Sequence, residues 1–181
     1  MKMEMLSCGP LAGIAIVVLT LLCGALAWMY LSLHRKNKLL YRQAEDTFRI
    51  KGAADHLLQS LPEAQLTQDQ RLFKRLTELL QEGEVFRDQQ LDREKLAKML
   101  GTNRTYLSSA VKSITGGLPI RDYVNSYRLR YAAQLLVNEK DLPVTTVGER
   151  AGFKTTSTFY RSFKDRFGML PSEYRKYSAL K

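Results

Sequence analysis

The chain has 181 residues, which is enough for one domain of ordinary size with additional segments. It carries 28 basic and 18 acidic residues, a net charge of +10, and the part from Leu91 onward holds 17 of the basic and 8 of the acidic residues. A surface this basic suits either a solvated face or a polyanionic partner such as nucleic acid, and two cysteines are too few for a disulfide framework.

The residues available for acid–base or metal chemistry are few. Cys8 and Cys23 lie in or beside an apolar segment, at a spacing that suits no metal site. His34 and His56 lie far in sequence from either cysteine. The sequence therefore predicts a protein that is not an enzyme and that has no catalytic residues, metal or cofactor.

Residues 11–33 form an almost uninterrupted apolar run, LAGIAIVVLTLLCGALAWMYLSL. At helical rise this run spans a hydrocarbon core, for which about 20 residues suffice. Trp28 and Tyr30 stand near its end, where amphipathic rings favour the membrane interface. The run predicts one transmembrane helix, preceded by a short extracytoplasmic N-terminus over residues 1–10.

The flanking charges predict the orientation of this helix. HRKNK follows it directly, whereas the N-terminal side offers only Lys2 and the α-amino group against Glu4. By the positive-inside rule, the protein is a single-pass inner-membrane protein with its N-terminus outside and residues 34–181 in the cytoplasm. A cleaved signal peptide is the alternative, because residues 25–27 resemble a cleavage site, but the N-terminal region is hardly basic and the run is long for a signal. Lipidation is the other alternative, although the cysteine of the run follows a leucine.

Residues 34–90 predict a cytoplasmic helical linker. Within it, residues 38–61 have apolar side chains at spacings of three, four and seven, which suits a short coiled coil or a solvated helix that ends before Pro62. A second helix over 67–83 has the capping-box pair Thr67 and Gln70, and Gly83 as its stop. Its apolar stripe predicts packing on the C-terminal domain or on a second copy, through Leu72, Phe73, Leu76, Leu79 and Leu80.

A first helix-turn-helix unit is predicted from residue 91. Asp92 caps a short helix, Gly101 permits the turn, and Asn103 caps a second helix that ends at Gly116. The core face of that second helix is predicted to be Leu107, Val111 and Ile114. Its exposed face is predicted to contact DNA through Asn103, Arg104, Thr105, Ser108, Ser109 and Lys112.

A long helix over about 119–138 then connects to a second unit and is predicted to set the distance between the two. In that unit Gly152 forms the turn, Thr155 or Thr156 caps the next helix, and Gly168 ends it. Phenylalanines recur every four residues and predict a core face of Phe159, Phe163 and Phe167. The face predicted to contact DNA is Thr156, Ser157, Tyr160, Arg161 and Lys164. Arg161 could bond guanine O6 and N7 with both arms, or a phosphate.

Two sets of residues in the C-terminal half follow the pattern of a known family. The C-terminal set is Gly152-Phe153, Phe159, Phe163-Lys164, Phe167-Gly168, Pro171 and Tyr174-Arg175. The upstream set is Leu96-Ala97, Tyr106-Leu107-Ser108, Gly116, Tyr123, Arg128-Leu129, Ala132 and Leu135-Leu136. Through these matches residues 91–177 resemble the DNA-binding domain of the AraC/XylS transcription regulators. The resemblance implies an all-α domain over residues 91–181, made of two helix-turn-helix units joined by a long helix. It also implies base contacts from Thr105, Ser108, Ser109, Thr156, Ser157, Tyr160 and Arg161.

Three departures from the family pattern bear on function. Gly148 stands where the family usually has alanine, at a cost of up to about 1 kcal/mol in helix propensity. The first recognition helix offers short hydroxyls, so its specificity is expected to depend on Arg104, water or DNA shape. The strand pattern of the family's effector-binding barrel is missing, so small-molecule binding is not implied by the resemblance.

These observations predict a membrane-anchored, sequence-specific DNA-binding transcriptional regulator of a bacterium, with activation implied by the family resemblance. Its expected partners are double-stranded DNA, RNA polymerase, the membrane through residues 11–33, and a second copy or a separate membrane sensor. The alternative is a membrane-tethered adaptor that uses the helix-turn-helix fold to bind another protein.

Overall fold

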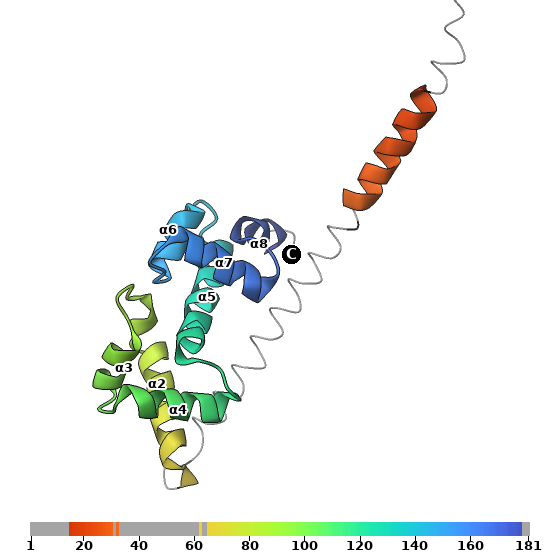
Figure 1. Ribbon diagram of the computed structural model, residues 1–181. Helices are drawn as coiled ribbons and strands as arrows, with labels where there is room; N and C mark the ends of the chain where they lie inside the picture. The colour runs from red at the N-terminus through yellow and green to blue at the C-terminus, as the bar shows by residue number, and fades with distance from the viewer. Residues whose placement is uncertain (1–14, 31, 33–61, 63–64, 179–181) are drawn as a thin grey trace, which may run out of the picture. The chain divides into compact units, whose positions relative to one another are not determined.

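A computed structural model describes residues 15–30, 32, 62 and 65–178, and divides the chain into two compact parts, Met1–Leu39 and Leu40–Lys181. In the N-terminal part residues 15–30 form an α-helix with exposed side chains (Figure 1). Within the described part of the chain, none of the helices has both the length and the apolar character needed to cross a membrane. The rest of the predicted span and the predicted linker helix over 38–61 lie outside the described residues.

The described secondary structure of the C-terminal part, Leu40–Lys181, is helical throughout, as the sequence predicts. Helix α5 joins two groups of shorter helices that lie at its two ends (Figure 1). In chain order the elements are α2 (Gln68–Gln81), the 3-10 helix η2 (Val85–Arg87), α3 (Arg93–Met99), α4 (Arg104–Thr115), α5 (Ile120–Asn138), α6 (Val144–Arg150), α7 (Thr156–Phe167) and α8 (Pro171–Ser178).

The helix ends follow the predicted capping chemistry. The side-chain oxygens of Asp92, Asn103 and Thr155 each accept the backbone N–H three residues later, at 2.8, 2.8 and 3.2 Å, and so begin α3, α4 and α7. Gly116 and Gly168 end α4 and α7 in the left-handed region, with φ of 71° and 70°. The two helix-turn-helix units therefore begin and end where local sequence signals place them.

Helix α2 belongs to the core of the first helix-turn-helix unit. Of the two predicted packing arrangements, on the C-terminal domain or on a second copy, this confirms the first. Its capping box is formed, with Thr67 and Gln70 bonding each other's backbone N–H groups at 2.8 and 3.3 Å. The buried hydroxyl of Thr77 lies 3.0 Å from that of Tyr123 on α5, which in turn lies 3.2 Å from that of Tyr127. The apolar residues that α2 adds to this core are Leu72, Phe73, Leu76 and Leu80.

The end of α2 differs from the prediction. The left-handed residue of its exit turn is Glu84, with φ of 45°, and not Gly83. A Cβ at Gly83 would lie 2.8 Å from the carbonyl oxygen of Leu79, so this glycine is required for close approach to the last turn of α2.

The second core is built on the phenylalanine face of α7. Phe159, Phe163 and Phe167 are at most 2% exposed, and the rings of Phe163 and Phe167 stack with centroids 4.2 Å apart. Tyr174 of α8 packs edge-on against these two rings, at 5.4 and 4.9 Å. This side of α7 is thereby fixed in the core, and its opposite side faces outward.

Gly148 is buried in α6 because α6 approaches α7 very closely. A Cβ at this position would lie 2.7 and 2.8 Å from two ring atoms of Phe159, a side chain with no exposed surface. The sequence predicted only a cost in helix propensity. The structure adds a packing reason that outweighs it, since the ring of Phe159 also contacts those of Phe153 and Phe163 and cannot move freely.

We expect Gly148→Ala to lower the free energy of unfolding by about 1–3 kcal/mol, because overpacking a rigid core costs that much. Urea unfolding followed by circular dichroism would measure the loss. Thr145→Ala, on the exposed side of the same helix, is the matched control and should change stability by no more than about 0.5 kcal/mol. A more stable Gly148→Ala variant would show that helix propensity governs this site.

Candidate nucleic-acid interface

The outward side of α4 carries small polar and basic side chains. Arg104, Thr105, Ser109 and Lys112 are exposed, as predicted, whereas Ser108 is half-buried. The hydroxyl of Ser108 donates to the carbonyl oxygen of Arg104 at 2.7 Å, so its proton is already used within the helix. The side-chain oxygen of Asn103 caps the helix, as described above. The side chains of α4 that can donate to a ligand are therefore mainly the two basic ones, Arg104 and Lys112. The hydroxyls of Thr105 and Ser109 can donate as well.

The outward side of α7 carries two basic side chains, two hydroxyl residues and a tyrosine. Thr156, Ser157, Arg161 and Lys164 are exposed, while Tyr160 is half-buried with its ring edge-on to Phe159 at 5.7 Å. Within the described ranges Arg161 forms no ion pair that would hold its guanidinium against the protein. Its planar fork of donors is thus available to a partner molecule.

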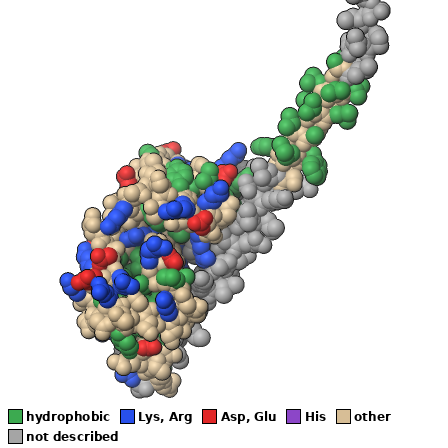
Figure 2. All heavy atoms as spheres, in the orientation of Figure 1, with side chains coloured by type: hydrophobic (Ala, Val, Ile, Leu, Met, Phe, Trp, Pro, Cys, Tyr) green, Lys and Arg blue, Asp and Glu red, His purple; other side chains and the backbone are tan. Residues whose placement is uncertain are grey.

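Helices α4 and α7 lie at opposite ends of α5 (Figure 1). Figure 2 shows Lys and Arg side chains gathered on this face of the C-terminal part, with fewer Asp and Glu side chains among them. The structure therefore presents two exposed polar helices on a basic domain, which is the arrangement needed to bind a long polyanion.

Arg128, near the middle of α5, ties the two units together. Its Nε donates to the carbonyl oxygen of Phe86 at 2.8 Å, and one of its terminal nitrogens donates to that of Asp88 at 3.0 Å. The guanidinium also lies over the ring of Phe153, 5.9 Å from its centroid. Burial lowers the pKa of the Arg128 guanidinium, which nevertheless stays charged at neutral pH. A single side chain thus contacts the segment before α3 and the turn before α7.

The turn of the second unit lies directly against the backbone of η2. Gly152 has φ of 86°, and a Cβ there would lie 2.4 Å from the carbonyl oxygen of Phe86 and 2.9 Å from that of Arg87. Beside it, the side-chain amide of Gln89 donates to the carbonyl oxygen of Glu149 at 3.4 Å. Only glycine permits this approach. The contact holds the second unit against the segment that leads into the first.

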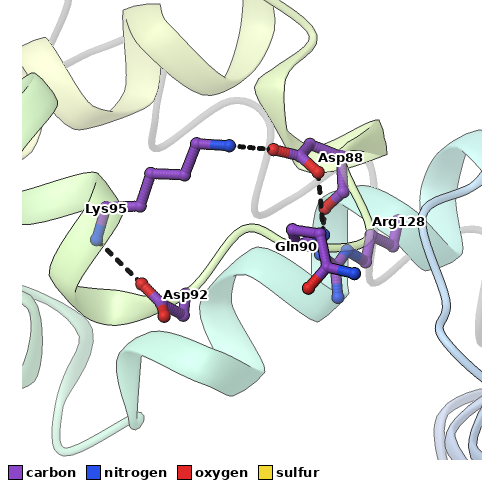
Figure 3. A network of polar contacts seen from close by, with 5 residues as sticks. All are labelled: Asp88, Gln90, Asp92, Lys95 and Arg128. Carbon is purple, nitrogen blue, oxygen red and sulfur yellow. Dashed lines mark hydrogen bonds and ion pairs between the residues drawn. The ribbon is translucent and has the colours of Figure 1, made fainter.

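The segment between η2 and α3 is itself anchored by charges (Figure 3). The carboxylate of Asp88 accepts the backbone N–H of Gln90 at 2.7 Å and forms an ion pair with Lys95 of α3. The hydrogen bond from Lys95, followed by that from Gln90, holds the pKa of Asp88 below its ordinary value. Asp88 therefore binds α3 through its side chain and Arg128 through its carbonyl oxygen.

Comparison with known proteins identifies this architecture. A family described as a helix-turn-helix domain matches residues 96–177. The C-terminal domain of AraT, a response regulator from Geobacillus stearothermophilus, superimposes with a TM-score of 0.54 at 27% identity, over 61% of this chain and 88% of that one. A transcriptional regulator of Chromobacterium violaceum, described as containing an AraC-type DNA-binding domain, superimposes with a TM-score of 0.50 at 26% identity, over 58% of this chain and 92% of that one. Residues 96–177 are therefore similar to such domains and are called the AraC-type domain.

Two curated relatives are similar to this chain over part of their length. The uncharacterized HTH-type transcriptional regulator YtdP of Bacillus subtilis is 35% identical over 89 residues, which is 49% of this chain and 11% of the relative. The RCS-specific HTH-type transcriptional activator RclR of Escherichia coli is 31% identical over 83 residues, 46% of this chain and 28% of the relative. The chain thus spans less than a third of the length of either relative. The AraC-type domain is a binding module and not an enzyme.

The sequence predicted the outward sides of α4 and α7. It did not reveal the long-range contacts of Arg128 and Gly152 that join the two helix-turn-helix units. Arg128 stood out only as one of the positions that match the family. Its bonds join residues 42 and 40 positions apart, so no local pattern could have revealed them. The glycine at 152 was predicted to form a turn, whereas its contact with Phe86 depends on the folded arrangement.

We expect Arg128→Ala to lower the free energy of unfolding of the AraC-type domain by about 2 kcal/mol, because two carbonyl groups lose a charged donor. Arg128→Lys should recover part of this loss, since an ammonium can bond one of the two oxygens. Urea unfolding would measure both. The control is Arg121→Ala, whose side chain is 85% exposed and which should change stability by no more than about 0.5 kcal/mol. Equal losses for Arg128→Ala and the control would contradict the bridging role.

Proposed function

We propose that this protein is a sequence-specific DNA-binding transcriptional regulator that places α4 and α7 in two successive segments of the major groove. The observation that carries the proposal is the fixed pair of outward-facing polar helices, held by Arg128 and Gly152 on a basic domain. Helix-turn-helix domains read base edges with the exposed face of the second helix of each unit. The relatives named as transcriptional regulators support the same function.

The two recognition helices have unequal roles in this proposal. Helix α7 provides most of the direct base contacts through Arg161, with Thr156, Ser157 and Tyr160 beside it. Helix α4 acts more through contacts of Arg104 and Lys112 with the phosphate backbone of DNA, and through recognition of DNA shape. The support is chemical: the uncharged donors of α4 are short hydroxyls, and one of them, Ser108, bonds its own helix.

Transcriptional activation is the proposed outcome of binding, with RNA polymerase as the protein partner. RclR, which matches over the AraC-type domain, is named a transcriptional activator. The competing function is a tethered adaptor that binds a protein through the same fold. Salt distinguishes the two, because a protein that neutralises several phosphates loses affinity steeply as log salt rises.

Membrane attachment through residues 11–33 is also proposed. Its support is the apolar run itself, the aromatic residues near its end and the basic residues that follow. A tethered regulator binds only DNA that comes to the membrane, and its signal would reach it from a second copy or from a separate membrane sensor.

The DNA-binding proposal predicts that Arg161→Ala weakens binding by about 1–3 kcal/mol and relaxes the preference at one base pair. The target is first selected from a random DNA pool, and dissociation constants are then measured for it and for its single-base variants at several salt concentrations. Lys164→Ala is the matched control and should weaken binding to all sequences alike, with a salt slope smaller by about 1. A uniform loss for Arg161→Ala would reassign it to phosphate, and a salt-independent affinity would favour the adaptor.

The membrane proposal predicts that removing residues 1–33 releases the protein from the membrane fraction and leaves its DNA affinity unchanged. Fractionation of cells that express the full and shortened chains measures the first effect, and binding to the selected target measures the second. A shortened chain that still sediments with membranes would refute the anchor. Loss of DNA affinity in a folded shortened chain would instead give these residues a part in binding.

A further inference from the structure

A groove of about 510 Å³ lies between the two helix-turn-helix units. Helix α7 contributes Thr158 to its lining, and α4 contributes none of the lining residues. The apolar walls of the groove come from three places in the chain. Leu91 and Leu96 belong to the start of the first unit, Ile120 and Val124 to α5, and Phe153 to the turn before α7. This volume falls within the roughly 300–1,000 Å³ of ordinary small-molecule sites.

The floor of the groove is apolar and its rim is basic. Leu96, Ile120, Val124 and Phe153 line the groove and contribute the apolar atoms of its floor, although each is at most 7% exposed. Arg93, Arg121 and Lys154 are exposed lining residues that come from three different elements. Asp92 is the one acidic side chain among the lining residues, and its carboxylate caps α3 by accepting the N–H of Lys95.

We propose that this groove binds a small amphipathic anion, with a carboxylate or sulfonate group and an aromatic or aliphatic body. The body would cover the apolar floor, where each Å² of apolar surface removed from water contributes about 25 cal/mol. The anionic group would lie at the rim, within reach of Arg121 and Lys154. The proposal goes beyond DNA binding, because it assigns a ligand to a surface between the two units.

A DNA backbone fits this groove less well. Phosphates are bound by protruding cations and backbone N–H groups, and they gain nothing from a concave apolar floor. An apolar floor beside a basic rim favours a molecule that has both an apolar body and an anionic group.

Such a ligand would act on DNA binding, and this consequence rests on the proposed function. It contacts both units, and Lys154 and Thr158 of its site flank the N-terminal end of α7. A bound anion there adds negative charge beside the helix that is proposed to enter the groove of DNA. Ligand and DNA would therefore weaken each other's binding, by the same factor in both directions.

The test uses 2-naphthoate as the probe and its neutral carboxamide as the comparison, titrated calorimetrically into the full chain in neutral detergent micelles, with micelles alone as the blank. We expect one molecule of 2-naphthoate per chain and clearly weaker binding of the carboxamide. The double variant Arg121→Gln, Lys154→Gln should lower the affinity for 2-naphthoate about fivefold, as expected for two exposed charge contacts. Lys140→Gln, an exposed change outside the groove, is the matched control and should leave it unchanged.

A second variant, Asn125→Phe, places a ring at the groove from α5 and should abolish binding of both probes while the helical circular dichroism is retained. Absence of 2-naphthoate binding, equal affinity for the carboxamide, or indifference to both variants would overturn the proposal. A double variant that loses DNA affinity and keeps 2-naphthoate affinity would assign the rim to phosphates instead, which also overturns it. Because the titration contains no DNA, its failure leaves the proposed function standing.

Discussion

The geometry of this domain depends on the two hydrogen bonds by which Arg128 holds the carbonyl oxygens of Phe86 and Asp88. Helix α5 contributes its first half to the core of one unit and its second half to the core of the other. A shared helix fixes the distance between two units but leaves each free to rotate on its packing surface. Arg128 removes that freedom, because the carbonyls belong to the segment that leads into α3 while its guanidinium covers Phe153 of the second unit.

The cost of burying this guanidinium is offset by what surrounds it. Removal from water disfavours the charged form, and two carbonyl oxygens together with an aromatic face replace part of the lost hydration. The carbonyl of Phe86 serves twice, since it accepts from Arg128 and also forms the surface on which Gly152 rests. Asp88 likewise has two roles, through its carbonyl oxygen toward α5 and through its carboxylate toward Lys95. The segment from Phe86 to Asp88 therefore contacts both α5 and the turn of the second helix-turn-helix unit, and so couples the two units.

Local signals in the sequence predicted most of the fold, and long-range geometry accounts for what they missed. The caps at Asp92 and Asn103 and the four-residue spacing of the phenylalanines depend on neighbours along one helix, so they could be recognised without a structure. Gly148 was weighed only by helix propensity, because its contact with Phe159 exists only once α6 and α7 have packed. For the residues predicted to contact DNA, helical periodicity was enough to predict that they lie on the outward sides of α4 and α7. The internal bond of Ser108 was beyond such a pattern, since a serine hydroxyl can turn outward or back to its own helix. The predicted membrane span stays a prediction.

The rigid coupling of α4 to α7 affects which of the two helices must contact specific bases in the proposed function. If α7 makes the base-specific contacts, each correct base pair there contributes about 1–3 kcal/mol of discrimination. Because Arg128 and Gly152 fix α4 relative to α7, the register chosen by α7 also determines which groove segment meets α4. Helix α4 then needs no long base-contacting side chains of its own, and its basic residues can contribute affinity without selecting a sequence. The short hydroxyls of α4 and the bridge at Arg128 are in this sense complementary, since a weakly selective helix is useful only where its position is imposed by its partner.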